Sequence, residues 1–509
     1  MLNHFVEFLN SLYQILNYDC KECKRDTIYI YDFGGYDFMK KTKNICSIGP
    51  STQNWEAFKG IVEAGMNVAR INFSHATMEE RKLDESLIKR ANEELGANIA
   101  TLYDTKGPDL RTCTFVDDYI ELVEGETIRI VENDLGDQGT AEKISFNYRN
   151  VVKDLHEGAV VLLDDGFYKL VVESEDDSDG GSVVCRIMNG GKIKSRRGVC
   201  IPGIKLDVPY ISEQDREDIK YTCDMDGDFL AISFVNTADD VNEARALCAE
   251  FGKPNMPIIS KVETQYAMDN LPEIVEASDY IMIARGDLGV ETGVENLPLY
   301  QQMMIDECHK QGKGCIMATQ MMTSMKKNIR PTNAEVTDVA NAVLRGCDAI
   351  MTSDETTMGD YPVETIQAMA SICNKVEKLT KYELGDFNLK GTDIHNTIAK
   401  CVVEASRQLP IKAIVVSTAT GKTAEDISSL RPESLILAIT PNEKVAKALA
   451  LKWGVYSKVA GNGVDTDSIV EAGIEAAKEM FDLNTGDLVA VVGGFPDDAH
   501  TNFMKIEEI

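Results

Sequence analysis

Two short apolar runs end abruptly in charged side chains that could do chemistry together. The run IISKVE delivers Lys261 and Glu263, and the run IMIARGDLG delivers Arg285 and Asp287. Residues two apart in a β-strand point to the same side, so we expect Lys261 beside Glu263 and Arg285 beside Asp287. A lysine near two carboxylates could accompany a divalent metal and place a cation over a phosphorylated or enolic substrate. A single such run is more simply a solvated strand end, so the interpretation depends on recurrence.

The pattern does recur, because eight short β-type runs alternate with amphipathic helical stretches. Ser212 followed by Asp215 is a capping box that marks the start of one such helix. The expected strands are Asn44–Ile48, Asn67–Phe73, Asn98–Asp104, Phe229–Val235, Pro257–Glu263, Tyr280–Gly286, Gly314–Gln320 and Ala349–Glu355. Eight strand–helix repeats with nearly continuous apolar strands predict an α/β protein with a (β/α)₈ TIM barrel. The active site of such a barrel lies at the C-terminal ends of its strands.

Most of these runs end in reactive side chains that would converge on one rim. Besides the pairs named above, the strand ends carry Arg70, Asn72, Ser74, Asp104, Thr105, Thr319, Gln320, Ser353 and Glu355. Glu263 and Asp287 offer the oxygen ligands that Mg²⁺ or Mn²⁺ prefers, whereas zinc would favour His or Cys. Arg70 and Lys261 could neutralise a phosphoryl group in flight, and Gly286 leaves backbone N–H groups open to a carboxylate.

Four residues at neighbouring strand ends form a second candidate site, for a monovalent cation. They are Asn72, Ser74, Asp104 and Thr105. Together they offer several oxygens and one formal charge. Turn capping is the alternative use of these side chains, and their spacing leaves both uses open.

The repeat is interrupted once and is followed by a third pattern. Leu110–Leu206 alternates apolar and polar residues and is rich in Gly and Asp turns, which predicts an inserted antiparallel β-barrel domain. After about Thr380, strands and helices alternate again and predict an open α/β domain. We assign the domains as 1–40, an N-terminal extension without assigned role; 41–108 and 207–378, the barrel; 109–206, the insertion; and 379–509, the C-terminal domain.

Composition excludes several classes of partner. The net charge of −31 and pI of about 4.6 argue against nucleic acid or an anionic membrane surface, both of which need a basic face. No apolar stretch reaches the roughly 18 residues of a transmembrane helix. Thirteen cysteines scattered in or beside apolar runs predict buried thiols in a reducing cytoplasm. Cys20 and Cys23 form a lone CxxC that lacks two further zinc ligands.

The chain resembles the pyruvate kinase family from about residue 41 to its end. The motifs that carry the resemblance are TKNICSIGPST (42–52), GMNVARINFSHA (65–76), YDTKGPDLRT (103–112), ISKVET (259–264), ARGDLG (284–289), ATQMMTSM (318–325), RPTNAEVTDVANAV (330–343) and SDETTMGDYP (353–362). The resemblance implies a glycolytic phosphotransferase that moves the phosphoryl group of phosphoenolpyruvate to ADP, giving pyruvate and ATP. It also implies Mg²⁺ (or Mn²⁺) and K⁺ as cofactors and a homotetramer.

The resemblance also implies roles for individual residues. Lys261 would stabilise the transferring phosphoryl group and the enolate, and Thr319 would help to protonate the enolate through ordered water. The implied Mg²⁺ ligands are Glu263 and Asp287, and the implied substrate contacts are Arg70, Lys261, Gly286, Asp287 and Thr319. The implied K⁺ ligands are Asn72, Ser74, Asp104 and Thr105, and the implied nucleotide contacts are Asn72, His75, Arg111 and Arg197 with its neighbour Arg196. The insertion would be a lid that excludes water from the reaction.

This chain departs from the family pattern at several positions. Arg196 and Arg197 stand where lysine is common, so forked donors replace point charges. Asp109 is acidic, as expected of K⁺-dependent members, although its side chain is the shorter one. Asn333 replaces an arginine associated with a subunit contact, and Asp354 replaces a frequent glycine near the substrate rim.

The turn STATGKT in the C-terminal domain resembles the family's sugar-phosphate effector turn. It supplies Thr418, Thr420, Gly421, Lys422 and Thr423, whereas the leading glycine of a nucleotide P-loop is missing. The partner loop GGFPDDAHTN (493–502) is short and acidic through Asp497 and Asp498, which would repel a phosphate. We therefore expect regulation by fructose 1,6-bisphosphate to be weak or absent, with a monophosphate effector on the first turn as the alternative.

Two other functions compete with this interpretation. A metal-dependent aldolase or mutase acting on pyruvate or its enol would use the same carboxylate pair, but would not need the insertion, the K⁺ site or Arg111. A catalytically silent regulatory or scaffold relative would be expected to lose Lys261, Glu263 or Asp287, and all three are present.

Overall fold

The computed structural model describes residues 39–132, 138–148, 150–176, 181–204, 208–382, 393–461, 466–481, 483–494 and 501–509. The predictions for the N-terminal extension before residue 39, for Cys20 and Cys23, and for Asp497 and Asp498 lie outside these residues. Lys40 is fully buried, and its ammonium donates to the carbonyl oxygen of Gly65 and the side-chain oxygen of Asn67, both at 2.9 Å.

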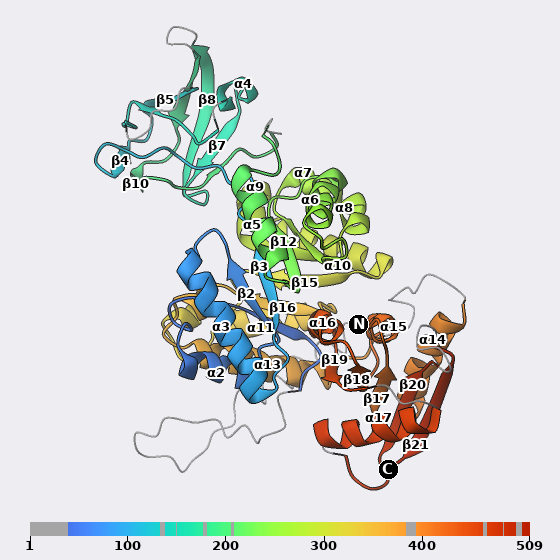
Figure 1. Cartoon of the computed structure of the whole chain (residues 1–509). Helices are drawn as coiled ribbons and strands as arrows, with labels where there is room; N and C mark the ends of the chain where they lie inside the picture. Colours follow the sequence, from blue (N-terminus) through green and yellow to red (C-terminus); the bar gives the residue numbers. More distant parts are fainter. Residues whose placement is uncertain are drawn as a thin grey trace, which may run out of the picture. The chain divides into compact units, whose positions relative to one another are not determined.

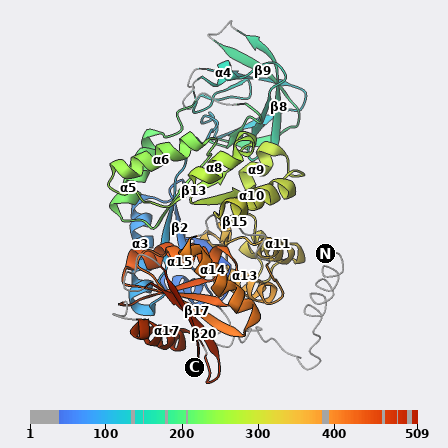
Figure 2. The same ribbon diagram turned by 90° about the vertical axis from the view of Figure 1, so that its right-hand side faces the viewer.

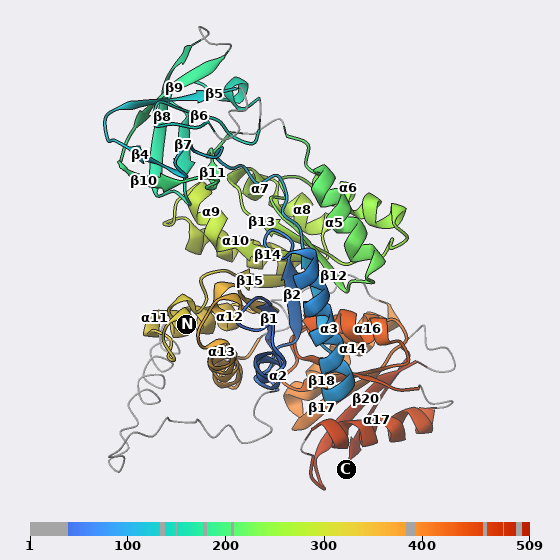
Figure 3. The ribbon, with the colours of Figure 1, turned by 60° about the vertical axis from the view of Figure 1, so that its left-hand side comes forward.

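Eight parallel strands close into a barrel, which confirms the predicted fold class (Figures 1 and 3). They are β1 (Lys43–Ser47), β2 (Val68–Asn72), β3 (Ala100–Asp104), β12 (Phe229–Ile232), β13 (Ile258–Val262), β14 (Tyr280–Ala284), β15 (Gly314–Ala318) and β16 (Ala349–Thr352). One buried apolar cluster takes side chains from all eight strands, among them Phe229, Tyr280 and Met282. The barrel is therefore filled by its own side chains and leaves its polar groups for the strand ends.

Helices follow the strands, and several of them start at a capping side chain. They are α2 (Trp55–Glu63), α3 (Met78–Leu95), α5 (Glu213–Asp224), α6 (Ala238–Glu250), α7 (Gln265–Asp269), α8 (Leu271–Ala277), α9 (Arg285–Thr292), α10 (Leu297–Gln311), α11 (Asn333–Leu344), α12 (Asp354–Thr357) and α13 (Pro362–Glu377). The predicted capping box of Ser212 and Asp215 starts α5, and Thr332 with Glu335 forms another at α11.

The insertion between β3 and β12 is a small β domain with its own core. Its strands are β4 (Tyr119–Leu122), β5 (Thr127–Val131), β6 (Lys143–Ile144), β7 (Val160–Leu163), β8 (Tyr168–Asp176), β9 (Ser182–Ile187), β10 (Gly191–Lys194) and β11 (Val199–Cys200), with the short helix α4 (Val151–Asp154). All pairs are antiparallel except β5 with β6. Within the described ranges these strands form a six-stranded and a two-stranded sheet around one core, because β4 and β10 pair with each other alone.

The C-terminal domain is a five-stranded sheet covered on both faces. Its strands are β17 (Ile411–Ser417), β18 (Leu435–Thr440), β19 (Val455–Val459), β20 (Leu488–Gly493) and the antiparallel β21 (Phe503–Glu508), in the order β19-β18-β17-β20-β21. Helices α14 (Ile394–Gln408) and α15 (Lys422–Ser429) pack on one face, and α17 (Thr466–Met480) packs on the other (Figure 2). The edge strand β21 was not predicted, since its charges mask the apolar alternation.

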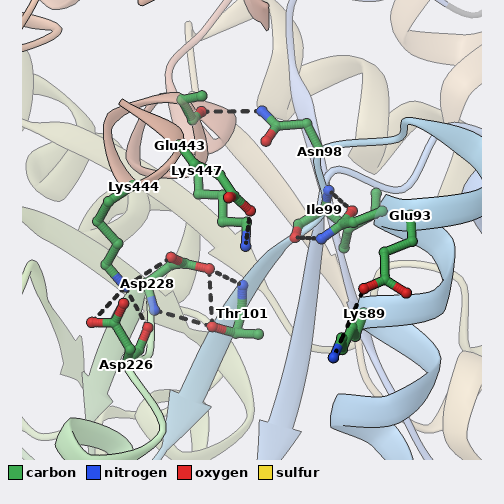
Figure 4. Close-up of polar contacts among 12 residues, drawn as sticks. Lys89, Glu93, Asn98, Ile99, Thr101, Asp226, Asp228, Glu443, Lys444 and Lys447 are labelled. Atoms are coloured by element: carbon green, nitrogen blue, oxygen red, sulfur yellow. Dashed lines mark hydrogen bonds and ion pairs between the residues drawn. The ribbon is translucent and has the colours of Figure 1, made fainter. Parts of the chain in front are cut away.

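The C-terminal domain is tied to the amino ends of the barrel strands by polar contacts that centre on the buried Asp228 (Figure 4). The ammonium group of Lys444, on α16 (Glu443–Ala448), donates to the backbone carbonyl oxygens of Asp226 and Gly227 and, at 3.0 Å, to the Asp228 carboxylate. The second oxygen of Asp228 accepts the amide and hydroxyl of Thr101 at 2.9 and 3.0 Å. Leu451 joins the apolar cluster inside the barrel.

The cysteines in the described ranges are free thiols, and most of them are buried. Of the helices that the structure describes, none has the length and apolar character needed to cross a membrane.

The Asp228 contacts predict a stability difference between two nearby variants. Asp228→Ala leaves the Lys444 ammonium and the Thr101 donors without their buried acceptor, so we expect a loss of about 2–4 kcal/mol in the free energy of unfolding. Glu443→Ala removes only the exposed partner of Lys447 and should change the free energy of unfolding by less than about 0.5 kcal/mol. Denaturant-induced unfolding measures the free energy of unfolding of both variants. Equal losses would show that the contacts of Asp228 contribute little to stability.

Candidate active site at the carboxyl ends of the barrel strands

Lys261 lies at the centre of a compact group of charges. Its ammonium is 3.2 Å from a Glu263 oxygen and 3.5 Å from an Asp104 oxygen, and it donates to the Ser233 hydroxyl at 2.7 Å. Only 13% of the Lys261 side chain is exposed, and both carboxylates are buried. The predicted placement of Lys261 and Glu263 on one side of the strand is confirmed.

The predicted pairing of Arg285 with Asp287 is wrong. β14 ends at Ala284, and Arg285 already begins helix α9, in which residues two apart diverge. The Arg285 guanidinium turns instead to the Asp338 carboxylate at 2.6 Å and to the carbonyl oxygens of Ala318 and Thr319. Arg285 therefore braces the end of β15.

Thr319 adopts an unusual backbone conformation beside the start of α9. Its φ is +66° and that of Gln320 is +54°, which is the left-handed region that β-branched residues avoid. The hydroxyl of Thr319 accepts the backbone N–H of Gly286 at 3.0 Å. The Arg285 contacts to its carbonyl oxygen hold this strained turn, so the Thr319 hydroxyl and the first turn of α9 lie side by side.

Burial and charge act against each other at Lys261 and Glu263. Burial opposes the charge on Lys261, but the carboxylates of Asp104 and Glu263 outweigh it and raise the pKa of the ammonium. Burial raises the pKa of Glu263, Lys261 lowers it, and the Asp287 carboxylate raises it further, so that the net direction is upward. The oxygen that does not face Lys261 accepts the backbone N–H of Phe234 at 2.7 Å. Glu263 is thus a buried carboxylate that a further cation would stabilise.

Arg70 and Asp104 form the second ion pair of the site. Arg70 donates from Nε and Nη2 to one Asp104 oxygen, both at 2.7 Å, and from Nη1 to the Ser47 hydroxyl at 2.7 Å. Burial would raise the pKa of Asp104, but Lys261 and Arg70 outweigh it and lower the pKa below its ordinary value. Asp104 therefore lies between two cations that favour its ionised form.

The structure brings the predicted monovalent-cation residues to neighbouring strand ends but also uses them locally. Asn72 and Asp104 are register partners on β2 and β3. The Asn72 side-chain oxygen accepts the backbone N–H of Ser74 at 3.1 Å, and the Thr105 hydroxyl accepts that of Ser233 at 3.4 Å. The local use of these side chains is therefore present, whereas the cation site stays a prediction, in which a bound cation would share Asp104 with Arg70 and Lys261.

A cleft of about 580 Å³ unites residues from the barrel and the insertion. Glu263 and Asp287 line it from the barrel, and Arg111 and Arg197 line it from the insertion. Arg111 pairs with Asp109 at 2.6 Å and donates to the Arg196 carbonyl oxygen, while Arg197 pairs with Asp164 at 3.5 Å. Asn72 and the exposed His75 lie outside the lining of this cleft.

Sequence reasoning missed Ser233, whose hydroxyl accepts from Lys261 and donates to the Thr105 carbonyl oxygen at 2.7 Å. It follows β12 directly, so a polar residue at the end of the fourth predicted strand was the available signal. Asp354, for which the sequence offered no account, pairs with Lys326 at 2.7 Å.

The predicted effector turn satisfies most of its own polar groups. The Thr418 hydroxyl accepts the Gly421 N–H at 2.9 Å, and the Thr423 hydroxyl lies 2.5 Å from that of Thr501. Thr420 accepts weakly from the Lys422 N–H, at 3.4 Å. The Lys422 ammonium is directed to Asp426, at 2.8 Å.

A TIM barrel with an inserted β domain, an α/β domain and a lysine–carboxylate centre defines a phosphotransferase of the barrel class. The family model "Pyruvate kinase, barrel domain" matches residues 39–366, and "Pyruvate kinase, alpha/beta domain" matches residues 396–507. The chain belongs to the pyruvate kinase family and has the function of that family, which decides against an aldolase or mutase.

Comparisons with individual proteins agree with this family assignment. A pyruvate kinase of Staphylococcus saprophyticus is 40% identical over 473 residues, which are 92% of this chain and 80% of that protein. One of Geobacillus stearothermophilus is 40% identical over 475 residues, with the same shares. The crystal structure of a pyruvate kinase from Cryptosporidium parvum matches with a TM-score of 0.87 and 34% identity, over 93% of this chain and 97% of the other.

The raised pKa of Glu263 predicts a pH dependence of metal binding. A divalent ion binds the ionised carboxylate, so protonation competes with it as the pH falls towards the raised pKa. We expect Mn²⁺ affinity, measured by electron paramagnetic resonance, to fall clearly between about pH 8 and about pH 6, where an ordinary carboxylate is fully ionised. Equal affinity at both pH values would contradict the pKa shift.

Proposed function

We propose that this chain transfers the phosphoryl group of phosphoenolpyruvate to ADP at the Lys261 centre, with Mg²⁺ held by Glu263 and Asp287 and with K⁺ as activator. The observation that carries the proposal is the Lys261 ammonium between the buried carboxylates of Asp104 and Glu263. These carboxylates keep the lysine charged and fix its position. During its transfer, the anionic phosphoryl group would lie beside an ammonium group that is already charged and in position.

The carboxylate pair fits a divalent cation. Glu263 is buried with a raised pKa, and the nearby charge of Asp287 contributes to that rise. Among the described residues no group of three or more His, Cys, Asp or Glu side chains forms a metal cage, so substrate and water oxygens would complete the coordination. When bound, Mg²⁺ would supply charge neutralisation at the phosphoryl oxygens. Asp287 is exposed at the cleft, where it can follow the substrate.

The start of α9 suits the carboxylate of the substrate. The Gly286 N–H, at the amino end of this helix, donates to the Thr319 hydroxyl, and the positive end of the helix dipole favours an anion beside it. A Cβ at position 286 would lie 3.8 Å from the Thr319 hydroxyl, an ordinary contact, so the protein itself does not require glycine there. The glycine instead leaves space for the substrate. Thr319 would orient the water that protonates the enolate, and Arg70 would face the phosphoryl group from β2.

The nucleotide would lie on the side of the cleft formed by the insertion. Arg111 and Arg197 keep 39% and 43% of their side chains exposed, and their aspartate partners hold them towards the cleft. Asn72 and His75 would border the nucleotide from the loop after β2. In this role the insertion is a lid that excludes water from a hydrolysable transition state.

Assembly, location and regulation follow from the family resemblance. We infer a homotetramer in the cytoplasm, without nucleic-acid or membrane partners. Asn333 is exposed at the first position of α11, so it is free to serve a subunit contact different from that of an arginine. The Thr418–Thr423 turn remains a candidate for a sugar-phosphate effector, with fructose 1,6-bisphosphate weak or inactive.

Lys261→Met tests the proposed reaction. The substitution removes the cation but keeps the length of the side chain, so we expect ATP formation from phosphoenolpyruvate and ADP to fall by about 10³-fold or more. Lys326→Met, which breaks a partly exposed pair with Asp354, is the matched control and should retain activity. Circular dichroism checks that both variants fold. A mild effect at position 261 would refute the role of this lysine.

Replacing K⁺ with tetramethylammonium tests the monovalent-cation site. The larger ion cannot be held by the oxygens of Asn72 and Asp104, so the rate of ATP formation should fall at constant ionic strength. An unchanged rate would show that the residues at the ends of β2 and β3 serve only as turn caps and ion-pair partners.

A further inference from the structure

A second cavity, of about 300 Å³, lies between the barrel and the C-terminal domain. Its barrel wall includes Gly312–Gly314, at the start of β15, and Asp348, just before β16. Its other wall comes from the first turns of α14 and from α15. The candidate active site lies at the carboxyl ends of the barrel strands, so this cavity at their amino ends is separate from it.

Cations converge on this cavity from both walls. These cations are Lys313, Arg431, Lys422 and Lys452, in a chain whose net charge is −31, and the His395 ring also lines the cavity. The carboxylates are already engaged. Asp426 accepts from His395 at 2.5 Å and Lys422 at 2.8 Å, Glu425 pairs with Lys452 at 3.2 Å, and Asp348 pairs with Arg431 at 3.0 Å. Asp393, the remaining acidic side chain of the lining, caps α14 by accepting the Asn396 N–H at 2.8 Å.

Lys313 differs from the other cations. Its ammonium rests on the backbone carbonyl oxygens of Glu276 and Ser278, and no carboxylate of the described residues forms an ion pair with it. Burial lowers its pKa, so an anion in the cavity would stabilise its charged form. Among the described residues, the acceptors of the Lys313 ammonium are therefore backbone carbonyl oxygens, and the Asp279 carboxylate acts on it only from beyond ion-pair distance.

Lys422 connects the cavity to the predicted effector turn. The turn uses the Thr418 and Thr423 hydroxyls within the protein, as described above, whereas Lys422 lines the cavity and keeps 63% of its side chain exposed. His395 is 24% and Lys452 is 20% exposed, so a solute can reach the donors from the Lys422 side.

We propose that this cavity binds a small anion carrying a phosphate group, with Lys313 on the barrel and His395, Lys422 and Lys452 on the C-terminal domain as its donors. A tetrahedral phosphate accepts hydrogen bonds from several directions, which matches donors on two opposing walls better than a planar carboxylate would. Bound there, the anion links the barrel to the C-terminal domain.

Inorganic phosphate tests the site on the full-length chain, by isothermal titration calorimetry and thermal melting at constant ionic strength. We expect saturable binding that raises the melting temperature. Lys313→Met and His395→Leu, made separately, should each weaken binding by about tenfold or more, because each removes a hydrogen-bond donor from the lining. Neither residue belongs to the catalytic centre, so the rate of ATP formation without phosphate should persist in both.

Two control variants locate the binding. Lys400→Met changes an exposed lysine on α14 that does not line the cavity, and Thr420→Val changes the effector turn. Both should bind phosphate as the unaltered chain does. The proposal is overturned if binding is not saturable, or if Thr420→Val weakens it while Lys313→Met and His395→Leu do not. Binding that survives both cavity variants would likewise place the phosphate elsewhere, including in the active site.

Discussion

The ion cluster of Lys261, Asp104 and Glu263 is the interaction on which the proposed site depends. Charges buried in protein are costly unless they are paired, and here one ammonium is within 3.5 Å of two carboxylates. The pairing needs β3 and β13 on either side of β12, as the closed barrel places them. Fold and site are therefore linked, since the cluster exists only when strands far apart in sequence have met.

Around this cluster, some side chains are held in place by hydrogen bonds, whereas another is exposed. Arg70 is locked on Asp104 and Ser47, and Arg285 holds the strained end of β15, so the cationic wall and the Thr319 hydroxyl are fixed before substrate arrives. Asp287, by contrast, is exposed to the cleft. A metal bound there would meet one rigid ligand and one that can adjust, which suits a site that must accept and release substrate.

Much of this arrangement could be predicted from local patterns. Apolar runs fixed the eight strands to within a few residues, and the spacing of Lys261 and Glu263 predicted their shared side. The prediction that Arg285 and Asp287 point to the same side was wrong because the alternation of a strand was assumed to continue past Ala284, where a helix begins. Ser233 had a signal in its place after the fourth strand, but its contact with Lys261 and the direction of Lys422 could not be predicted, since each depends on partners that only the folded chain brings near. The edge strand β21 was missed because its alternating charges resemble a loop.

The most direct test of the account is Mn²⁺ binding by Glu263→Gln, followed by electron paramagnetic resonance, with Asp354→Asn as the control. The amide keeps the shape of the side chain but removes the buried charge that would hold the metal. The account predicts that Glu263→Gln loses affinity by about tenfold or more while Asp354→Asn keeps it. Unchanged affinity in folded Glu263→Gln would contradict the assignment of the metal to the Lys261 centre.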